Sequence, residues 1–258
     1  MVMEKSAASR EQLGKEIISG LYQERMILTW FRDKSDGWTL ASGLWSPFYV
    51  NLRLISSTKN PQLYEKSGRA IGMLLDDIGF APDGKHRVVG VAMAGIPLAN
   101  AVTLQKGIPS LYTRKLPEDV KTPEKLNEYM AAHGQHALVE GEIESGNRLA
   151  IIDDLVTKFD SKILAKSQVE YEITRRMLTE VTVKDFVVLV DREQGGVEKA
   201  KSLGLNLYSF IPFASKGLEW LRGDLADIEY KTIVDYLNDP VKYQDKELQK
   251  SLKELIRK

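Results

Sequence analysis

Short apolar runs alternate with helix-like segments through the middle of this chain, and that alternation restricts its fold more than any other feature. The segments with strand character are 87–92, 108–112, 149–152, 186–190 and 205–210. Helical spacing falls between them, at 96–105, 161–179 and 197–202. Strands that alternate with helices form an α/β fold, a central mainly parallel sheet with helices on both faces. Ligands of such sheets bind beyond the carboxyl ends of the strands.

The composition argues against several classes of function. Lysine plus arginine and aspartate plus glutamate each number 36 among 258 residues, so the formal net charge is zero. We therefore expect no nucleic-acid partner held by a dominant positive field. The chain lacks a long apolar run, and its first twenty residues have a helical charge pattern, so we expect no membrane partner and a cytoplasmic location. With no cysteine and three histidines, a disulfide framework, a thiol nucleophile and a histidine-rich metal centre are not expected.

We expect one domain over residues 1–258, with an addition at each end. Residues 9–24 place apolar side chains at helical spacing, and residues 38–53 surround a Ser-Gly and a Ser-Pro with aromatic and β-branched residues. The second pattern is typical of two short strands joined by a tight turn. Residues 1–60 would therefore form a helix and a hairpin. Residues 239–258 contain leucines at helical spacing after an Asn-Asp-Pro, which predicts a C-terminal helical extension.

Residues 113–147 are the least core-like part of the chain. They contain many charges, three glycines and two prolines. Long loops of this composition are usually functional or disordered, so we expect a surface loop with about one helical turn. The alternative is a solvated run of charges with no further role.

The stretch LAIIDDLVTKFDS, residues 149–161, places two acids where an apolar run ends. Asp153 and Asp154 follow four apolar residues and are expected to be exposed at the strand end, while Thr157 and Ser161 offer hydroxyls before the next helix. Backbone amides that lead into a helix favour a phosphate, and carboxylates accept hydrogen bonds from ribose hydroxyls. The combination predicts a sugar-phosphate site. The alternative is that one acid only caps the following helix.

Four segments, in this order, resemble the orotate phosphoribosyltransferases, which are type I phosphoribosyltransferases. WTLASGLWSPFYVNLR (38–53) resembles their N-terminal hairpin, and AGIPLANAV (94–102) resembles their pyrophosphate-side loop. LAIIDDLVTKFDS resembles their phosphoribosyl pyrophosphate (PRPP) motif, and LVDREQGG (189–196) resembles the strand whose Asp-Arg contacts orotate. The resemblance implies the type I fold with a hairpin hood at residues 1–60, a homodimer, and a requirement for Mg²⁺ that is held mainly by PRPP.

The resemblance also implies roles for individual residues. Asp153 and Asp154 would bind the ribose of PRPP. The turn that would hold its 5′-phosphate consists of Thr157, Lys158, Phe159, Asp160 and Ser161. Ala94 and Gly95 would lie on the pyrophosphate side.

Other positions would contact the base or the leaving group. Arg192 would contact orotate, the alternative being a strand-end arginine paired with Asp191. Tyr49 or its neighbour Phe48 would stack on the base, unless both belong to the core. The mobile catalytic loop of the family would begin at Arg114 and Lys115 and include His133, and its cations would neutralise the departing pyrophosphate.

The sequence departs from the family pattern at several positions. Alanine replaces an expected lysine at Ala41, Ala94 and Ala131. Lys121 and Lys125 are the two candidates to supply the missing loop charge.

The phosphate turn also departs from the pattern, because Lys158, Phe159 and Asp160 stand where glycine and small residues are expected. Phe159 would add bulk beside the phosphate. We expect the Asp160 side chain to point away from the pocket and to cap the helix that follows.

These observations predict a glycosyltransferase of pyrimidine biosynthesis. It would transfer phosphoribosyl from PRPP to orotate, giving orotidine 5′-monophosphate and pyrophosphate, with no covalent intermediate. Two alternatives remain open. One is a catalytically altered nucleotide- or PRPP-binding regulatory protein on the same fold, and the other is a phosphoribosyltransferase for another base.

Overall fold

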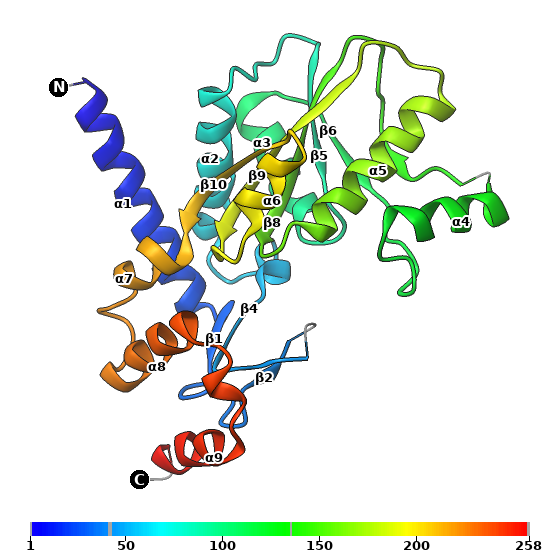
Figure 1. Ribbon diagram of the computed structural model, residues 1–258. Coiled ribbons are helices and arrows are strands. Elements are labelled where there is room, and N and C mark those ends of the chain that lie inside the picture. Colours follow the sequence, from blue (N-terminus) through cyan, green and yellow to red (C-terminus); the bar gives the residue numbers. More distant parts are fainter. Residues whose placement is uncertain (1, 41–42, 135, 257–258) are drawn as a thin grey trace. The chain divides into compact units, whose positions relative to one another are not determined.

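The computed structural model describes residues 2–40, 43–134 and 136–256. The chain divides into two compact units, and Figure 1 labels their elements. Unit 1 combines Met1–Leu63 with Phe213–Lys258, and unit 2 is the continuous segment Tyr64–Pro212. The prediction of a single domain stays a prediction. Within the described residues, no helix has the length and apolar character needed to cross a membrane.

Unit 2 is built on a six-stranded sheet. Its strands are β5 (His86–Gly90), β6 (Ser110–Thr113), β7 (Val139–Glu140), β8 (Arg148–Val156), β9 (Thr182–Asp191) and β10 (Asn206–Pro212). They lie in the order β10-β9-β8-β5-β6-β7, and every neighbouring pair is parallel except β6 and β7. The predicted α/β fold with a mainly parallel sheet is confirmed.

Five helices accompany these strands. They are α2 (Pro61–Asp77), which begins at the end of unit 1, and α3 (Gly95–Lys106), α4 (Pro123–His133), α5 (Asp160–Arg175) and α6 (Gly196–Ser202). The chain moves across the sheet in one direction from β5 to β6 and in the other from β8 to β10. With right-handed crossovers, this reversal places α3 on one face and α5 and α6 on the other. The strand order reverses between β5 and β8, which is where such a sheet binds its ligands.

The core explains why the central strands are nearly continuous apolar runs. β8 and β9 are buried on both faces of the sheet, as parallel strands covered by helices are. Alternate residues of the sheet, including Ile151, Phe186 and Val188, join one apolar cluster with Ala165 and Val169 of α5. α5 ends at Arg175, four residues before the predicted end at 179. The helix stops because Met177, at a φ of 54°, turns the backbone into the left-handed region.

The prediction of a loop with about one helical turn at residues 113–147 was wrong. This segment contains α4, an 11-residue helix, and the strand β7. Thr122 caps α4 by accepting a hydrogen bond from the Lys125 amide, and Pro123 occupies the first turn. Leu126 and Met130 are buried in a small apolar cluster that includes side chains of α5. We call residues 114–139 the lid segment.

Unit 1 contains short strands and helices from both ends of the chain. Its N-terminal elements are α1 (Val2–Gln23), β1 (Ile27–Thr29), β2 (Trp38–Thr39), β3 (Trp45–Ser46), β4 (Phe48–Val50) and the 3-10 helix η1 (Leu52–Leu54). Its C-terminal elements are η2 (Phe213–Gly217), α7 (Leu218–Trp220), α8 (Asp227–Asn238), η3 (Lys242–Gln244) and α9 (Lys246–Leu255). The predicted hairpin is only β2 with β3, because β4 pairs antiparallel with β1. The helix α9 confirms the predicted C-terminal helix, and α8 was not predicted.

Candidate active site

Two glycines bring the turn after β5 into close contact with β8. A side-chain carbon on Gly95 would lie 2.3 Å from the Ile152 carbonyl oxygen and 3.2 Å from Oδ1 of Asp153. The same addition at Gly90 would lie 2.7 Å from the Cα of Ile96. The predicted pyrophosphate-side loop therefore packs directly against the first acid of the pair, and Ala94 precedes α3 as a buried residue.

Asp153 is not an exposed strand-end residue, which corrects the prediction. β8 continues through the acid pair to Val156, and Asp153 is only 6% exposed. Its Oδ2 lies 2.6 Å from Nζ of Lys162, and its Oδ1 accepts a hydrogen bond from the Asp154 amide at 2.9 Å. The acid is tolerated inside the protein because a buried ammonium, 4% exposed as a residue, faces it.

Asp154 is partly buried, and its carboxylate lies beside that pair. Its Oδ1 accepts a hydrogen bond from the Leu155 amide at 2.7 Å. Burial and the negative charge of Asp153 raise the pKa of Asp154, and the positive charge of Lys162 opposes this rise. With a pKa of about 7, Asp154 changes its protonation state near neutral pH.

The turn from Thr157 to Ser161 has a different geometry from the one expected. Phe159 adopts a left-handed backbone, with φ at 73°, and its ring is 1% exposed in the core, where it meets Phe186 edge-on at 4.8 Å. The ring therefore adds no bulk beside a phosphate. A glycine-like backbone conformation is kept, although glycine itself is absent.

The charged residues of this turn face solvent. The Asp160 carboxylate is 62% exposed and accepts a hydrogen bond from Lys199 of α6. It points outward, but it does not cap α5, because the capping position is Phe159 and no side chain caps there. Lys158 is exposed. The turn therefore offers backbone groups and the hydroxyls of Thr157 and Ser161 to a ligand.

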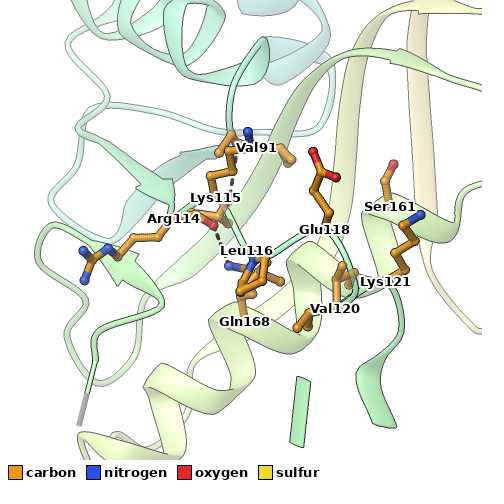
Figure 2. Close-up of a pocket in the computed structure, with 13 residues that line it drawn as sticks. Val91, Arg114, Lys115, Leu116, Glu118, Val120, Lys121, Ser161 and Gln168 are labelled. Carbon is orange, nitrogen blue, oxygen red and sulfur yellow. Dashed lines mark hydrogen bonds between the residues drawn. The ribbon is translucent and has the colours of Figure 1, made fainter. Parts of the chain in front are cut away.

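A cavity of about 270 Å³ lies between the turn after β5, the entry of the lid segment and the start of α5 (Figure 2). Its lining includes Ala92, Lys115, Glu118, Lys121 and Ser161. The Ala92 amide donates to Oγ1 of Thr113, which fixes the turn after β5 against the end of β6. Among the acids and turn residues of LAIIDDLVTKFDS, only Ser161 lines this cavity.

The basic residues predicted for the catalytic loop, Arg114, Lys115 and His133, lie in different environments. Arg114 and Lys115 both line the cavity, but Nε of Arg114 lies 3.5 Å from Oε1 of Glu140, and in Figure 2 its side chain extends away from the others. His133 ends α4, its ring stacks on Tyr129 and its Nδ1 lies 3.0 Å from the Tyr129 carbonyl oxygen. His133 is not among the residues that line the cavity.

The structure distinguishes the two candidate replacement lysines. Lys121 lines the cavity together with Ser161, and Figure 2 shows both side chains at the same end of it. Lys125 lies on α4, and its Nζ is 2.7 Å from Oε2 of Glu128 on the same helix. Lys121 is therefore the one that faces the candidate site. Ala131 is an exposed residue of α4.

The predicted base-contacting residues lie in both units. Arg192 directly follows β9, is 5% exposed, and its amide donates to the Val156 carbonyl oxygen at 3.0 Å. In unit 1, Phe48 is fully buried, whereas Tyr49 is partly exposed and stacks on Trp38 at 6.2 Å. Tyr49 is thus the aromatic of the pair that solvent reaches, and Phe48 is core. Ala41 lies outside the described residues.

Sequence reasoning missed Lys162, the buried partner of Asp153. The signal was weak, because a lysine two residues after the start of a helix is usually solvated. Its spacing from Asp153 carries no helical or strand periodicity, since a turn separates the two. Only the fold brings them together.

Comparisons with known proteins agree with the fold and with the family resemblance. No family model matches the chain. Bovine uridine 5′-monophosphate synthase is 30% identical over 202 residues, which are 78% of this chain and 36% of that protein, so this chain spans about a third of that relative. Orotate phosphoribosyltransferase from Pyrobaculum aerophilum is 29% identical over 206 residues, 80% of this chain and 92% of the relative.

A solved structure gives the fold independently. The crystal structure of orotate phosphoribosyltransferase from Aeropyrum pernix superposes with a TM-score of 0.60, covering 81% of this chain and 99% of that one at 23% identity. At this identity the match establishes the fold alone, and the sequence relatives establish the homology. This chain is a homologue of orotate phosphoribosyltransferases, and it has the type I phosphoribosyltransferase fold.

Proposed function

We propose that this protein transfers phosphoribosyl from PRPP to orotate, releasing pyrophosphate and giving orotidine 5′-monophosphate. The observation that carries the proposal is the meeting of three features where the strand order reverses. These are the acids of β8, the turn that opens α5 and the turn that opens α3. Relatives named orotate phosphoribosyltransferase support orotate as the base.

In this proposal, each feature binds one part of PRPP. Asp154 accepts hydrogen bonds from the ribose hydroxyls, beside Asp153. The turn from Thr157 to Ser161 holds the 5′-phosphate at the start of α5, a 16-residue helix whose amides and dipole favour an anion. Gly95 opens the 12-residue helix α3 on the pyrophosphate side.

The reaction exchanges one bond at ribose C1′ for another. The bond from C1′ to the pyrophosphate oxygen breaks, and its electron pair leaves with pyrophosphate. A ring nitrogen of orotate forms the new bond and loses its proton. Lys115 and Lys121, which line the cavity, would stabilise the charge that develops on pyrophosphate. Arg192 would bind the orotate carboxylate, because a planar guanidinium can donate two parallel hydrogen bonds to a carboxylate.

Mg²⁺ is part of the proposal as a companion of the substrate. The described residues contain no group of three or more acids, histidines or cysteines that could enclose a metal. Mg²⁺ commonly binds through substrate phosphates with few protein ligands, and the proposal is that PRPP holds most of the ion in this way. When bound, it would neutralise part of the pyrophosphate charge. The proposal also includes a homodimer, which the family resemblance supports, and a cytoplasmic location, which the sequence pattern supports.

The alternative of an altered binding protein has its own supporting observation. Alanine stands at positions 94 and 131, where the family pattern has lysine, and Ala94 is buried against the core. A chain that lost these cations would keep PRPP or nucleotide binding and lose turnover.

One assay separates the candidates. Purified protein is mixed with PRPP, Mg²⁺ and orotate, and pyrophosphate release is followed with and without orotate. Release that depends on orotate supports the proposed enzyme. PRPP binding by calorimetry without release, for orotate or any base in a panel, would instead support the regulatory protein. Release with a base other than orotate, and not with orotate, would show a phosphoribosyltransferase for that other base.

A further inference from the structure

Lys162 has no role in the reaction proposed above, yet it lies at the base of the candidate site. It is the third residue of α5 and is 4% exposed. Its Nζ lies 2.6 Å from Oδ2 of Asp153, 2.5 Å from the Leu155 carbonyl oxygen and 3.4 Å from Oγ of Ser161. An ammonium has three N–H donors, so each of them has one of these acceptors.

The acceptors lie at the two ends of the phosphate turn. Asp153 and Leu155 belong to β8, before the turn, and Ser161 is the last residue of the turn and already lies in the first turn of α5. The ammonium therefore bridges the two ends of the segment 156–161. The carboxylate is held from the other side as well, by the Asp154 amide on Oδ1 and by the close packing of Gly95.

Stability alone is a weak explanation for this pair. Removing a carboxylate and an ammonium from water carries a free-energy cost that offsets much of their attraction, and apolar residues of similar size are often as stabilising. What a buried pair does add is a fixed position for both groups. Here the fixed groups are an acid of the candidate site and the two ends of its phosphate turn.

We propose that Lys162 is a positioning residue for the ribose 5-phosphate part of PRPP, acting through Asp153 and through the turn 156–161. This inference rests on the proposed function, because PRPP is the ligand being positioned. The charged groups that act on Asp154 are Asp153, from the same strand, and Lys162, from α5. Lys162 opposes the rise in the pKa of Asp154 that burial and Asp153 cause, so it also favours the charged form of the second acid.

The test compares two identical substitutions on one helix. Lys162→Met removes the buried ammonium, and Lys166→Met removes a surface ammonium that pairs with Glu170 one turn later. PRPP affinity is measured by calorimetry with Mg²⁺ across a pH series. Lys162→Met should weaken binding about 10–100-fold, by analogy with the effect of residues that orient metal-binding side chains. Its binding midpoint should also move to higher pH, because Asp154 loses the cation that favours its charged form. Lys166→Met should stay within about twofold of wild type, as a solvent-screened surface pair should.

A double variant separates positioning from folding. Lys162→Met alone leaves the Asp153 carboxylate buried without its ammonium and will lower stability. Asp153→Asn with Lys162→Met removes both charges, so stability should recover while PRPP binding stays weak. Recovery of affinity along with stability would overturn the inference, as would a Lys162→Met variant with wild-type affinity and an unmoved pH midpoint. If neither wild type nor Lys166→Met binds PRPP, the proposed function is refuted, and this inference with it.

Discussion

Phe159 allows a sharp test of the phosphate turn, because two substitutions there should differ in an unusual order. The residue combines a buried ring with a left-handed backbone at φ 73°. Alanine would remove the ring and keep the backbone strain, whereas glycine would remove both. Glycine is normally the less stable of the two in regular structure, so the expected order is reversed here.

The expected magnitudes follow from the contacts of the ring. It is 1% exposed, meets Phe186 at 4.8 Å with an interplanar angle of 65°, and belongs to the main apolar cluster of unit 2. Truncating such a phenylalanine to alanine costs about 3–5 kcal/mol. A left-handed conformation costs a residue other than glycine about 1 kcal/mol or more. Phe159→Gly should therefore be less destabilising than Phe159→Ala by about 1 kcal/mol.

Chemical denaturation of the three proteins measures these differences. Both variants should remain folded in water, since domains of this kind have about 5–15 kcal/mol of stability. Circular dichroism against denaturant concentration gives each midpoint. The reasoning fails if alanine is at least as stable as glycine at this position, or if either change costs less than about 1 kcal/mol.

Three further predictions concern the acids and the lid segment. Burial and the charge of Asp153 raise the pKa of Asp154 from 3.8 to about 7, so wild type loses stability as the pH rises through that interval. The stability of Asp154→Asn relative to wild type, measured by denaturation, should therefore increase between about pH 4 and pH 7. A constant difference across that range would contradict the shift. Lys121→Ala should weaken PRPP binding about fivefold, equivalent to ~1 kcal/mol, because Lys121 lines the cavity. Lys125→Ala should change PRPP binding little, because the Lys125 ammonium pairs with Glu128 on its own helix. Equal effects of the two substitutions would contradict the assignment of Lys121 to the site. Leu126 is 1% exposed in the apolar cluster that packs the lid segment on α5, and Leu126→Ala should lower stability by about 2–5 kcal/mol. Trypsin should then cleave the lid segment of this variant faster than that of wild type when no ligand is present. An unchanged cleavage rate would mean that this packing does not hold the lid segment in place.

The fold could be predicted from the sequence because its signals are local. Buried strands such as β9 are apolar runs, and helices such as α9 repeat their apolar residues every three or four positions, so both are visible in short windows. The helix α4 also carried local signals, a capping Thr122 and Pro123 in the first turn. Its many charges concealed them, because only Leu126 and Met130 of that helix are buried.

The candidate site was predicted in outline but not in its internal contacts. The acids and the turn after them are adjacent in sequence, so their association needed no tertiary information. The partners of Asp153 and Asp160 did need it, because Lys162 and Lys199 reach these acids only after α5 and α6 fold back on the sheet. The burial of the Phe159 ring depended in the same way on Phe186, 27 positions further along the chain.

The composition of unit 1 has a consequence for how the chain is made. The Phe48 ring packs on Phe213 and Tyr236, with centroids 5.4 Å and 5.9 Å away, and the Trp30 indole donates to the Leu252 carbonyl oxygen. During synthesis these partners leave the ribosome after all of unit 2, which is continuous in sequence. At roughly 5–20 residues per second, the 165 positions from Phe48 to Phe213 take about 8–33 seconds to synthesise, so Phe48 waits that long for this partner. In this chain the middle segment can fold first, and the residues synthesised earliest are among the last to be buried.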